Sequence, residues 1–250
     1  MNEVLQTRNL SKSWGGFNAV SGVDFFMERG ARQALIGPNG AGKTTFINLL
    51  TGVFAPTVGE VLLNGERITG LAQHQRVKRG MTRTFQINTL FPGLTVMESV
   101  LLAVCERRGT AAQWRRTVAA CREEIDEALE ILRGLQLEKH ADTLTHKLPY
   151  GVQRLLEIAL SLATRPSVLL LDEPAAGIPS AESMELFSVI ARLPDHVSIL
   201  FIEHDMDLVF RFAERITVLV AGKILVQGTP AEIAADPQVR EIYLGQPPDA

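Results

Sequence analysis

The chain has 250 residues, of which 46% are hydrophobic and 21% charged, so it can bury a core without disulfide or metal staples. Its formal net charge of −3 argues against a general nucleic-acid-binding protein. The two cysteines, Cys105 and Cys121, lack C-x-x-C spacing, which fits a reducing compartment and predicts no cysteine metal site. The first residues, MNEVLQTRNL, do not resemble a signal peptide, and no apolar run approaches the roughly 18 residues of a membrane span.

Residues 3–37 predict strands joined by turns. The stretch GVDFFMERGARQALIG contains two apolar runs separated by Glu28-Arg29-Gly30, which predicts a hairpin. The following TTFINLLTG predicts a helix that ends at Gly52. The segment GEVLLNGERI predicts a second hairpin, which turns at Asn64-Gly65.

The pattern changes to helical spacing between about residues 97 and 164. In RRTVAACREEIDEALEILRGLQL, apolar residues recur at helical intervals with charged residues between them. Short apolar strands return in SVLLLDEP and VSILFIEHD, and RITVLVAGKILVQGTP predicts a last strand pair. Because strands separated by helices indicate a parallel sheet, we predict one α/β domain over residues 1–250. It has a parallel core, an antiparallel β region at the front and a helical insert at about residues 89–165.

The stretch GPNGAGKTT matches the pattern G-x-x-x-x-G-K-[ST], follows the apolar QALIG and opens a helix. Small residues let main-chain N–H groups surround phosphate oxygens, and the helix N-terminus adds partial positive charge. A simple glycine-rich turn is the alternative. Lys43 is expected to reach the β- and γ-phosphates, and the Thr44 hydroxyl to hold Mg²⁺. The residues assigned to the phosphates are Gly37, Pro38, Asn39, Gly40, Ala41, Gly42, Lys43, Thr44 and Thr45.

Acidic side chains follow the buried strand in VLLLDEP. Ligands of open α/β sheets bind at the carboxyl ends of the strands, so Asp172 suits Mg²⁺, largely through water, and Glu173 suits a base that deprotonates the attacking water. A charge pair at a helix N-terminus is the alternative. FIEHDM repeats this arrangement and places His204 at the same edge, where a structural histidine is the alternative. The other histidines lack this context and are expected to be structural: His74, His140, His146 and His196.

Two further residues are candidates for nucleotide contacts. Gln86, in TRTFQ, lies between the β region and the helical insert, where a polar side chain can contact Mg²⁺ and respond to movement of the insert. Trp14, in SKSWGG, precedes Gly37 by 23 positions and offers a flat face for adenine. The alternatives are an ordinary loop glutamine and a half-buried packing tryptophan.

These motifs, in this order, resemble the ATP-binding cassette (ABC) ATPases over residues 3–245. The resemblance implies an ABC-type P-loop NTPase core with an antiparallel β subdomain and an inserted helical subdomain. It further implies that Trp14 stacks on adenine, that Gly37–Thr45 is the Walker A loop, and that LLLDE is Walker B. Gln86 would be the Q-loop residue and His204 the switch histidine. The implied cofactors are ATP and Mg²⁺.

Several longer stretches resemble the ATPase subunits of branched-chain amino acid importers: LIGPNGAGKTTFINLLTG, RTFQ, LFPGLTVMESVLLA, LDEPAAG and IEHDM. Urea and short-chain amide importers carry similar ATPases, so the solute stays open. The resemblance implies two cassettes, identical or different, that dimerise head to tail around two ATPs at the cytoplasmic face of the inner membrane. A permease subunit would dock in a groove near Phe85–Met97, with Phe91 and Leu94 as apolar contacts. A solute-binding protein on the outer side of the membrane would complete the system.

The stretch LPYGVQ occupies the place of the family's LSGGQ signature, which binds the γ-phosphate of the opposite ATP. Pro149 replaces serine, Tyr150 replaces the first glycine and Val152 replaces glutamine, whereas Gly151 remains. Proline has neither a hydroxyl nor a backbone N–H, so one charge-assisted hydrogen bond is lost, worth roughly 1.5–3 kcal/mol. The amides from about Gly151 to Gln153 are expected to face the anion still.

The loop after Walker B departs from the family pattern as well, at Ile178-Pro179. Both departures lie on the surface that this family offers to the partner cassette, whereas the residues for the chain's own ATP are all present. This predicts an asymmetric dimer in which the site completed for the partner is the weaker one. A symmetric homodimer with a slower signature is the alternative.

Two other functions remain open from the sequence. A non-transport cassette that acts on nucleic acid or ribosomes is disfavoured by the single cassette, the short insert and the negative net charge. We expect no nucleic-acid partner, and we interpret the basic run QRVKRGMTR, with Arg76, Lys78, Arg79 and Arg83, as a solvated face. An export ATPase has a similar catalytic core, and RTFQ favours import by analogy alone.

Overall fold

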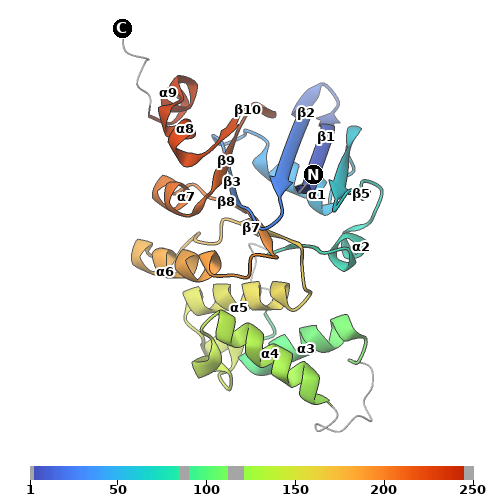
Figure 1. Cartoon of the computed structure of the whole chain (residues 1–250), viewed down its shortest axis with the longest axis vertical. Coiled ribbons are helices and arrows are strands. Elements are labelled where there is room, and N and C mark those ends of the chain that lie inside the picture. The colour runs from blue at the N-terminus through green and yellow to red at the C-terminus, as the bar shows by residue number, and fades with distance from the viewer. Residues whose placement is uncertain (1–2, 85–89, 112–120, 245–250) are drawn as a thin grey trace.

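The computed structural model describes residues 3–84, 90–111 and 121–244. Its strands form two sheets (Figure 1). The smaller sheet is antiparallel, with the order β2-β1-β4-β5. Its strands are β1 (Glu3–Trp14), β2 (Phe17–Glu28), β4 (Val58–Leu63) and β5 (Glu66–Arg67). The predicted hairpin at Asn64-Gly65 is confirmed, because both residues have the positive φ, 52° and 79°, that a tight hairpin turn requires.

The larger sheet has the order β10-β9-β3-β8-β7-β6, and β10 at its edge is antiparallel to β9, whereas the other pairs are parallel. Every residue of β3, β7 and β8 is buried, as expected for parallel strands covered on both faces. The predicted parallel core is therefore confirmed. Its strands are β3 (Arg32–Ile36), β6 (Met81–Arg83), β7 (Val168–Asp172), β8 (Ser198–Ile202), β9 (Arg215–Val220) and β10 (Lys223–Gly228).

The hairpin predicted at Glu28-Arg29-Gly30 is wrong, although both flanking runs are strands. β2 pairs with β1 in the small sheet, whereas β3 pairs with β8 and β9 in the large sheet. The chain thus passes from one sheet to the other at this turn, where the Gly30 N–H donates a hydrogen bond to Ser198 Oγ at 2.9 Å. Local turn residues show that a strand ends, but the partner of each strand depends on segments far along the chain.

The helices divide into two groups (Figure 1). Helix α1 (Lys43–Thr51) ends at Gly52, as predicted. The other helices beside the sheets are α2 (Gln73–Lys78), α6 (Ser180–Ala191), α7 (Met206–Phe212), α8 (Pro230–Ala235) and α9 (Pro237–Leu244). The second group lies together at the lower end of the molecule: α3 (Val96–Arg108), α4 (Arg122–Gly134), α5 (Tyr150–Leu162) and the 3₁₀ turns η2 (Glu138–His140) and η3 (Thr145–Lys147). These elements fall within the predicted helical insert, whose standing as a subdomain stays a prediction.

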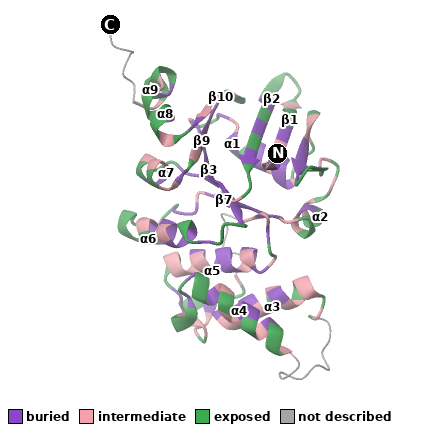
Figure 2. Cartoon of the chain, in the orientation of Figure 1, coloured by how far each residue is buried: buried purple, intermediate pink, exposed green. Residues whose placement is uncertain are grey.

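Two apolar clusters form the core, and β7 contributes to both. The strand β7 is buried along its length (Figure 2). Leu169 and Leu171 belong to the cluster shared with the helical group, α6 and α7, whereas Val168 and Leu170 belong to the cluster that includes α1 and the small sheet. This division follows from the alternation of side chains along a strand. The sheet therefore connects the helical group to the α1 side of the molecule. In the described ranges, no helix has the length and apolarity needed to cross a membrane.

The prediction that QRVKRGMTR forms a solvated face is wrong for two of its four basic residues. Lys78 and Arg79 are exposed, but Arg76 is only 1% exposed. Arg83 is largely buried and forms an ion pair with Asp172. A charged run is solvated only where no buried acceptors lie within reach, and the chain brings such acceptors to Arg76 and Arg83 from distant segments.

Candidate functional site

The loop from Gly37 to Gly42 connects the carboxyl end of β3 to the start of α1. Gly42 has a φ of 100°, and a Cβ added there would lie 2.4 Å from the carbonyl oxygen of Ala19. Only glycine satisfies both the conformation and the space at this position. The motif thus wraps closely enough for its main-chain N–H groups to cradle an anion at the start of α1.

The amine of Lys43 is held by the loop itself. It donates hydrogen bonds to the carbonyl oxygens of Gly37 at 2.6 Å and Pro38 at 3.2 Å. Burial lowers the pKa of Lys43, and the nearby carboxylates of Glu173 and Asp172 oppose this shift. A phosphate group at this loop would offer the amine a full negative charge in place of two neutral carbonyls.

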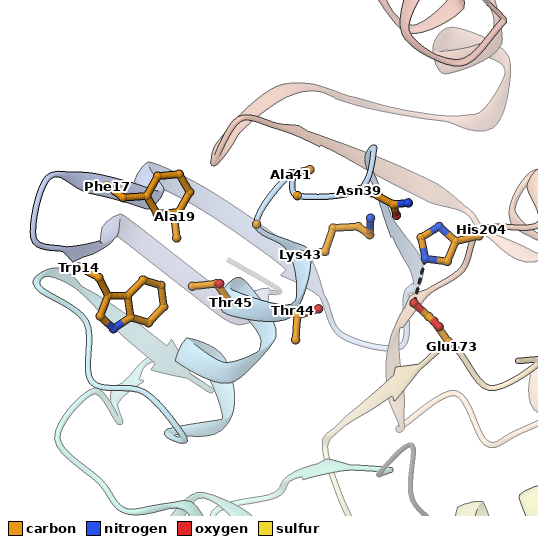
Figure 3. A pocket seen from close by; sticks show the side chains of 12 residues that line it. Trp14, Phe17, Ala19, Asn39, Ala41, Lys43, Thr44, Thr45, Glu173 and His204 are labelled. Atoms are coloured by element: carbon orange, nitrogen blue, oxygen red, sulfur yellow. Dashed lines mark hydrogen bonds and ion pairs between the residues drawn. The ribbon is translucent and has the colours of Figure 1, made fainter.

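A cavity of about 330 Å³ lies over this loop (Figure 3). Trp14 and Phe17 lie at one end, and Glu173 and His204 lie at the other, with Lys43 between them. The cavity therefore has an aromatic end and an acid–base end, separated by the phosphate loop. Its lining residues are Trp14, Phe17, Ala19, Asn39, Gly40, Ala41, Gly42, Lys43, Thr44, Thr45, Glu173 and His204.

The aromatic end contains one residue that the sequence analysis missed. Trp14 and Phe17 are a cross-strand pair at the turn between β1 and β2, and both are exposed, Trp14 by 44%. Trp14 and Phe54 form a T-shaped contact at a ring-centroid distance of 5.3 Å. Phe17 was detectable in principle, because two aromatic residues flanking a two-residue turn lie opposite each other in a hairpin.

The acid–base end is built from neighbouring strands. Glu173 directly follows β7, and His204 follows β8 by two residues, so both side chains reach the same edge of the sheet. The Nε2 atom of His204 lies 2.8 Å from Oε1 of Glu173 (Figure 3). Glu173 has a φ of 50°. This backbone conformation is unfavourable for any residue other than glycine, and it recurs at functional sites. The structure thus brings together Glu173, the predicted base, and His204, the histidine predicted to lie at the same edge of the sheet.

Glu203 is a buried carboxylate beside this pair that the sequence analysis also missed. Its Oε1 accepts a hydrogen bond from the Ala175 N–H at 2.9 Å, and its Oε2 accepts one from the His204 N–H at 3.2 Å. Burial raises the pKa of Glu203, and the charge of Glu173 acts in the same direction. Glu203 therefore links the loop after Glu173 to the loop that carries His204. A charged residue directly after the four apolar residues Ile199–Ile202 was the available signal.

Asp172, the predicted metal residue, is buried at the end of β7. Its Oδ2 lies 2.5 Å from Nη2 of Arg83, which follows from the pairing of β6 with β7. Thr44, the other described metal candidate, is exposed at the start of α1 and lines the cavity. Gln86 lies outside the described residues, so its predicted contact with Mg²⁺ stays a prediction.

The signature segment begins α5, with Pro149 as the residue before its first turn. The Gln153 N–H donates to the carbonyl oxygen of Pro149 at 3.0 Å, so the expectation that the Gln153 amide faces an anion is wrong. The first-turn amides that have no acceptor inside a helix are those of Tyr150, Gly151 and Val152. The free amides begin at Tyr150, one residue earlier than predicted, because α5 starts there.

Two side chains crowd this end of α5. A Cβ added at Gly151 would lie 3.3 Å from Oε2 of Glu182, which comes from α6. The Tyr150 hydroxyl accepts a hydrogen bond from Nη2 of Arg154 at 2.5 Å and donates to the Ala176 carbonyl at 3.3 Å. Glu182 could not be identified from the sequence, because its approach to Gly151 depends on how α6 packs against α5.

The segment predicted to meet a permease is partly described. Phe85 lies outside the described residues, Phe91 is 60% exposed and Leu94 is partly buried. The segment is held from one side, because Thr145 Oγ1 donates to the Phe91 carbonyl at 2.5 Å and His146 Nδ1 lies 2.6 Å from the Pro92 carbonyl. The groove itself stays a prediction.

A phosphate loop between β3 and α1, acidic and histidine side chains at the ends of the next strands, and a helical group on the same sheet define a P-loop nucleotide-binding cassette. The comparisons with known proteins agree. The family model described as ABC transporter matches residues 20–176, and the model described as branched-chain amino acid ATP-binding cassette transporter matches residues 223–248. The chain belongs to the ABC transporter family, whose nucleotide site is that of an ATPase.

Relatives match nearly the whole chain. The chain is 40% identical to the high-affinity branched-chain amino acid transport ATP-binding protein BraF of Pseudomonas aeruginosa, over 97% of this chain and 98% of the relative. It is also 40% identical, with the same coverage, to the corresponding protein LivG of Escherichia coli. A probable LivG of Archaeoglobus fulgidus is 34% identical over 97% of this chain and 96% of that protein.

Solved structures confirm the predicted fold class. The ADP conformation of MJ1267, an ATP-binding cassette of an ABC transporter, superimposes with a TM-score of 0.84 and 29% identity over 98% of this chain and all of that one. A dimeric structure of MJ0796, a bacterial ABC transporter cassette, gives 0.73 and 25% over 90% of this chain and 98% of that one. Cassettes of this fold thus bind nucleotide and are found as dimers.

Proposed function

We propose that this chain is the ATP-hydrolysing subunit of an importer for branched-chain amino acids. The observation that carries the proposal is the placement of the Glu173–His204 pair, 2.8 Å apart, at the edge of the sheet that also carries the phosphate loop. The importer class comes from the relatives, which resemble the chain along nearly its whole length. The chain acts as a peripheral subunit at the cytoplasmic face of the inner membrane.

In this proposal, the cavity over the phosphate loop binds ATP along its length. Adenine lies at the aromatic end against Trp14, and the phosphates lie in the loop Gly37–Thr45, where Lys43 exchanges its carbonyl partners for phosphate oxygens. Glu173 orients the attacking water and accepts its proton. His204 holds the Glu173 carboxylate through the 2.8 Å contact and adds a polar group near the γ-phosphate.

Mg²⁺ fits the donor set near the phosphate loop. The Thr44 hydroxyl is exposed at the start of α1, Asp172 places a carboxylate at the end of β7, and hydroxyl and carboxylate oxygens are ligands that Mg²⁺ prefers. Gln86 is the third proposed ligand. When bound, the ion supplies positive charge to the β- and γ-phosphates.

The proposed partners are permease subunits, a second cassette and an external solute-binding protein. Phe91 supports the permease site. Its side chain is 60% exposed, and the main-chain carbonyls of Phe91 and Pro92 are held by Thr145 and His146. Phe91 therefore presents a fixed apolar contact. The residues that line the nucleotide site do not identify the solute, so an importer for urea or short-chain amides is the alternative within the same class.

The burial of two basic residues counts against a cassette that acts on nucleic acid or ribosomes. Arg76 is fully buried and Arg83 is paired with Asp172, so only two of the four cations in this run are exposed. A nucleic-acid surface needs clustered, accessible positive charge. The basic run therefore does not supply one.

The proposal is tested by reconstituting the full complex, with its membrane subunits and solute-binding protein, into proteoliposomes. We expect uptake of leucine, isoleucine or valine that requires Mg-ATP and this chain. Uptake of urea or acetamide in place of leucine would support the alternative importer. ATP turnover that responds to RNA or ribosomes but not to any of these solutes would contradict the transport function.

We further propose that the dimer is asymmetric, because this chain offers its partner a weak signature. Pro149 contributes no donor, and Glu182 places a carboxylate near Gly151, where it disfavours a second anion. The chain's own Walker site, in contrast, keeps each of the expected side chains. A partner cassette with an intact signature would therefore complete the stronger site.

Restoring the signature serine should raise turnover at the weaker site. In a complex that carries Glu173→Gln in this chain, the remaining ATP turnover reports the partner's site, which LPYGVQ completes. Adding Pro149→Ser restores a charge-assisted hydrogen bond worth roughly 1.5–3 kcal/mol, so we expect this turnover to rise by about 10- to 150-fold. Pro194→Ser, near the opposite end of α6 from Glu182, is the matched control. Unchanged turnover in the Pro149→Ser complex would contradict the weak-site proposal.

A further inference from the structure

Arg83 lies between two parts of the proposed metal site. It ends β6, opposite Leu170 of β7, and only 11% of its side chain is exposed, compared with 4% for Asp172. Its Nη2 lies 2.5 Å from Oδ2 of Asp172, and its Nη1 donates to Oδ1 of Asn48 at 2.7 Å. One guanidinium group therefore contacts both β7 and α1.

The contact with Asn48 connects Arg83 to the helix that carries Thr44. Asn48 follows Thr44 by four residues on α1, and residues four apart lie on the same face of a helix. The guanidinium is planar and rigid, so its two ends fix the distance between the groups they contact. Arg83 thus ties the face of α1 that carries Thr44 to the carboxylate of Asp172.

We infer that Arg83 is a positioning residue for Mg²⁺, which sets the Asp172 carboxylate relative to Thr44 through its contact with Asn48. This rests on the proposed function, in which Thr44 and Asp172 hold the ion. The ion pair uses Oδ2 of Asp172 and is not bidentate, so Oδ1 is not engaged by Arg83. The positive charge of Arg83 also stabilises a carboxylate that would be costly to bury alone.

A purely structural role makes a different prediction. If Arg83 only neutralised Asp172 in the folded state, its loss would lower stability and reduce nucleotide affinity equally with and without metal. A positioning role instead requires that the gain in affinity from Mg²⁺ is lost. The ratio of the ATP dissociation constants in EDTA and in Mg²⁺ separates the two roles, because the phosphate loop contributes to both constants.

The experiment uses the full-length chain with Glu173→Gln, so that ATP is not consumed, and measures ATP binding by titration calorimetry in Mg²⁺ and in EDTA. Arg83→Lys keeps the charge and so preserves folding, but a single ammonium cannot bridge Asp172 and Asn48 as the fork does. Asn48→Ala removes the α1 end of the tie. We expect both variants to lower the ratio of the ATP dissociation constant in EDTA to that in Mg²⁺ at least fivefold. The dissociation constant in EDTA itself should stay within about twofold of the parent value. Arg79→Gln, an exposed arginine that pairs with Glu66, is the control.

A ratio in Arg83→Lys and Asn48→Ala that stays within twofold of the parent would overturn the inference. A ratio that is unchanged while the melting temperature falls would assign Arg83 a structural role, which also overturns it. If the Glu173→Gln parent binds no ATP in either condition, the proposed function fails, and the inference fails with it.

Discussion

Glu173→Gln is expected to reduce ATP turnover at this chain's site by roughly 100- to 10 000-fold, because a general base contributes about that much to a proton transfer. Glutamine preserves the size of the side chain and can still accept a hydrogen bond from His204, but it cannot take a proton from water. ATP binding should persist, because Lys43 and the phosphate loop are unchanged. Turnover is measured in the full complex with its membrane subunits, with the substitution in this chain alone.

The control is Glu66→Gln, which removes an exposed carboxylate on β5 and should leave turnover unchanged. Near-total loss of turnover in the Glu173→Gln complex would show that this chain's site is required for the cycle. Little loss would show that the partner's site does most of the hydrolysis although LPYGVQ faces it. The assignment of the weak and strong sites would then be reversed.

The parts of the site that the sequence predicted are those that lie on contiguous stretches of chain. The phosphate loop is one nonapeptide, from Gly37 to Thr45, whose conformation follows from its glycines and from the strand and helix that flank it. Glu173 and His204 each follow a short apolar strand, and parallel strands place their carboxyl ends at one edge. Their 2.8 Å contact is a consequence of strand order.

Apart from Phe17, the residues that the sequence did not predict act across distant segments. Arg83 meets Asp172, 89 positions away, and Glu203 meets Ala175, 28 positions away. Glu182 approaches Gly151 only because α6 packs against α5. Arg83 was predicted to be solvated, because the local sequence does not indicate whether a charged side chain has a buried partner. The Glu28-Arg29-Gly30 turn was misinterpreted because β2 and β3 pair with strands from other parts of the chain.

Arg76→Met is expected to lower the free energy of unfolding by about 3–5 kcal/mol, because it removes the donor of four hydrogen bonds and a buried carbonyl group left unpaired costs about 1–3 kcal/mol. The guanidinium of Arg76 donates to the carbonyl oxygens of Leu49 and Leu50 at the end of α1, at 2.8 and 2.5 Å. It also donates to those of Thr69 at 2.7 Å and Leu71 at 3.0 Å. Burial lowers the pKa of Arg76 to about 10, still far above neutral pH, so the group stays charged and favours the negative end of the helix.

Methionine is close to arginine in length but donates no hydrogen bond, so these four carbonyl groups, two of them in buried hydrogen bonds, would be left without this donor. Urea denaturation of the full-length chain measures the change, with Lys78→Met on the same helix, an exposed position, as the control that should stay within about 0.5 kcal/mol. Equal values for the two variants would contradict the anchoring role of Arg76. Since α1 begins with Lys43 and Thr44, ATP affinity measured below the denaturation midpoint then distinguishes two effects. A fall in affinity in the folded fraction means that Arg76 also holds the phosphate loop in place, whereas unchanged affinity confines its role to stability.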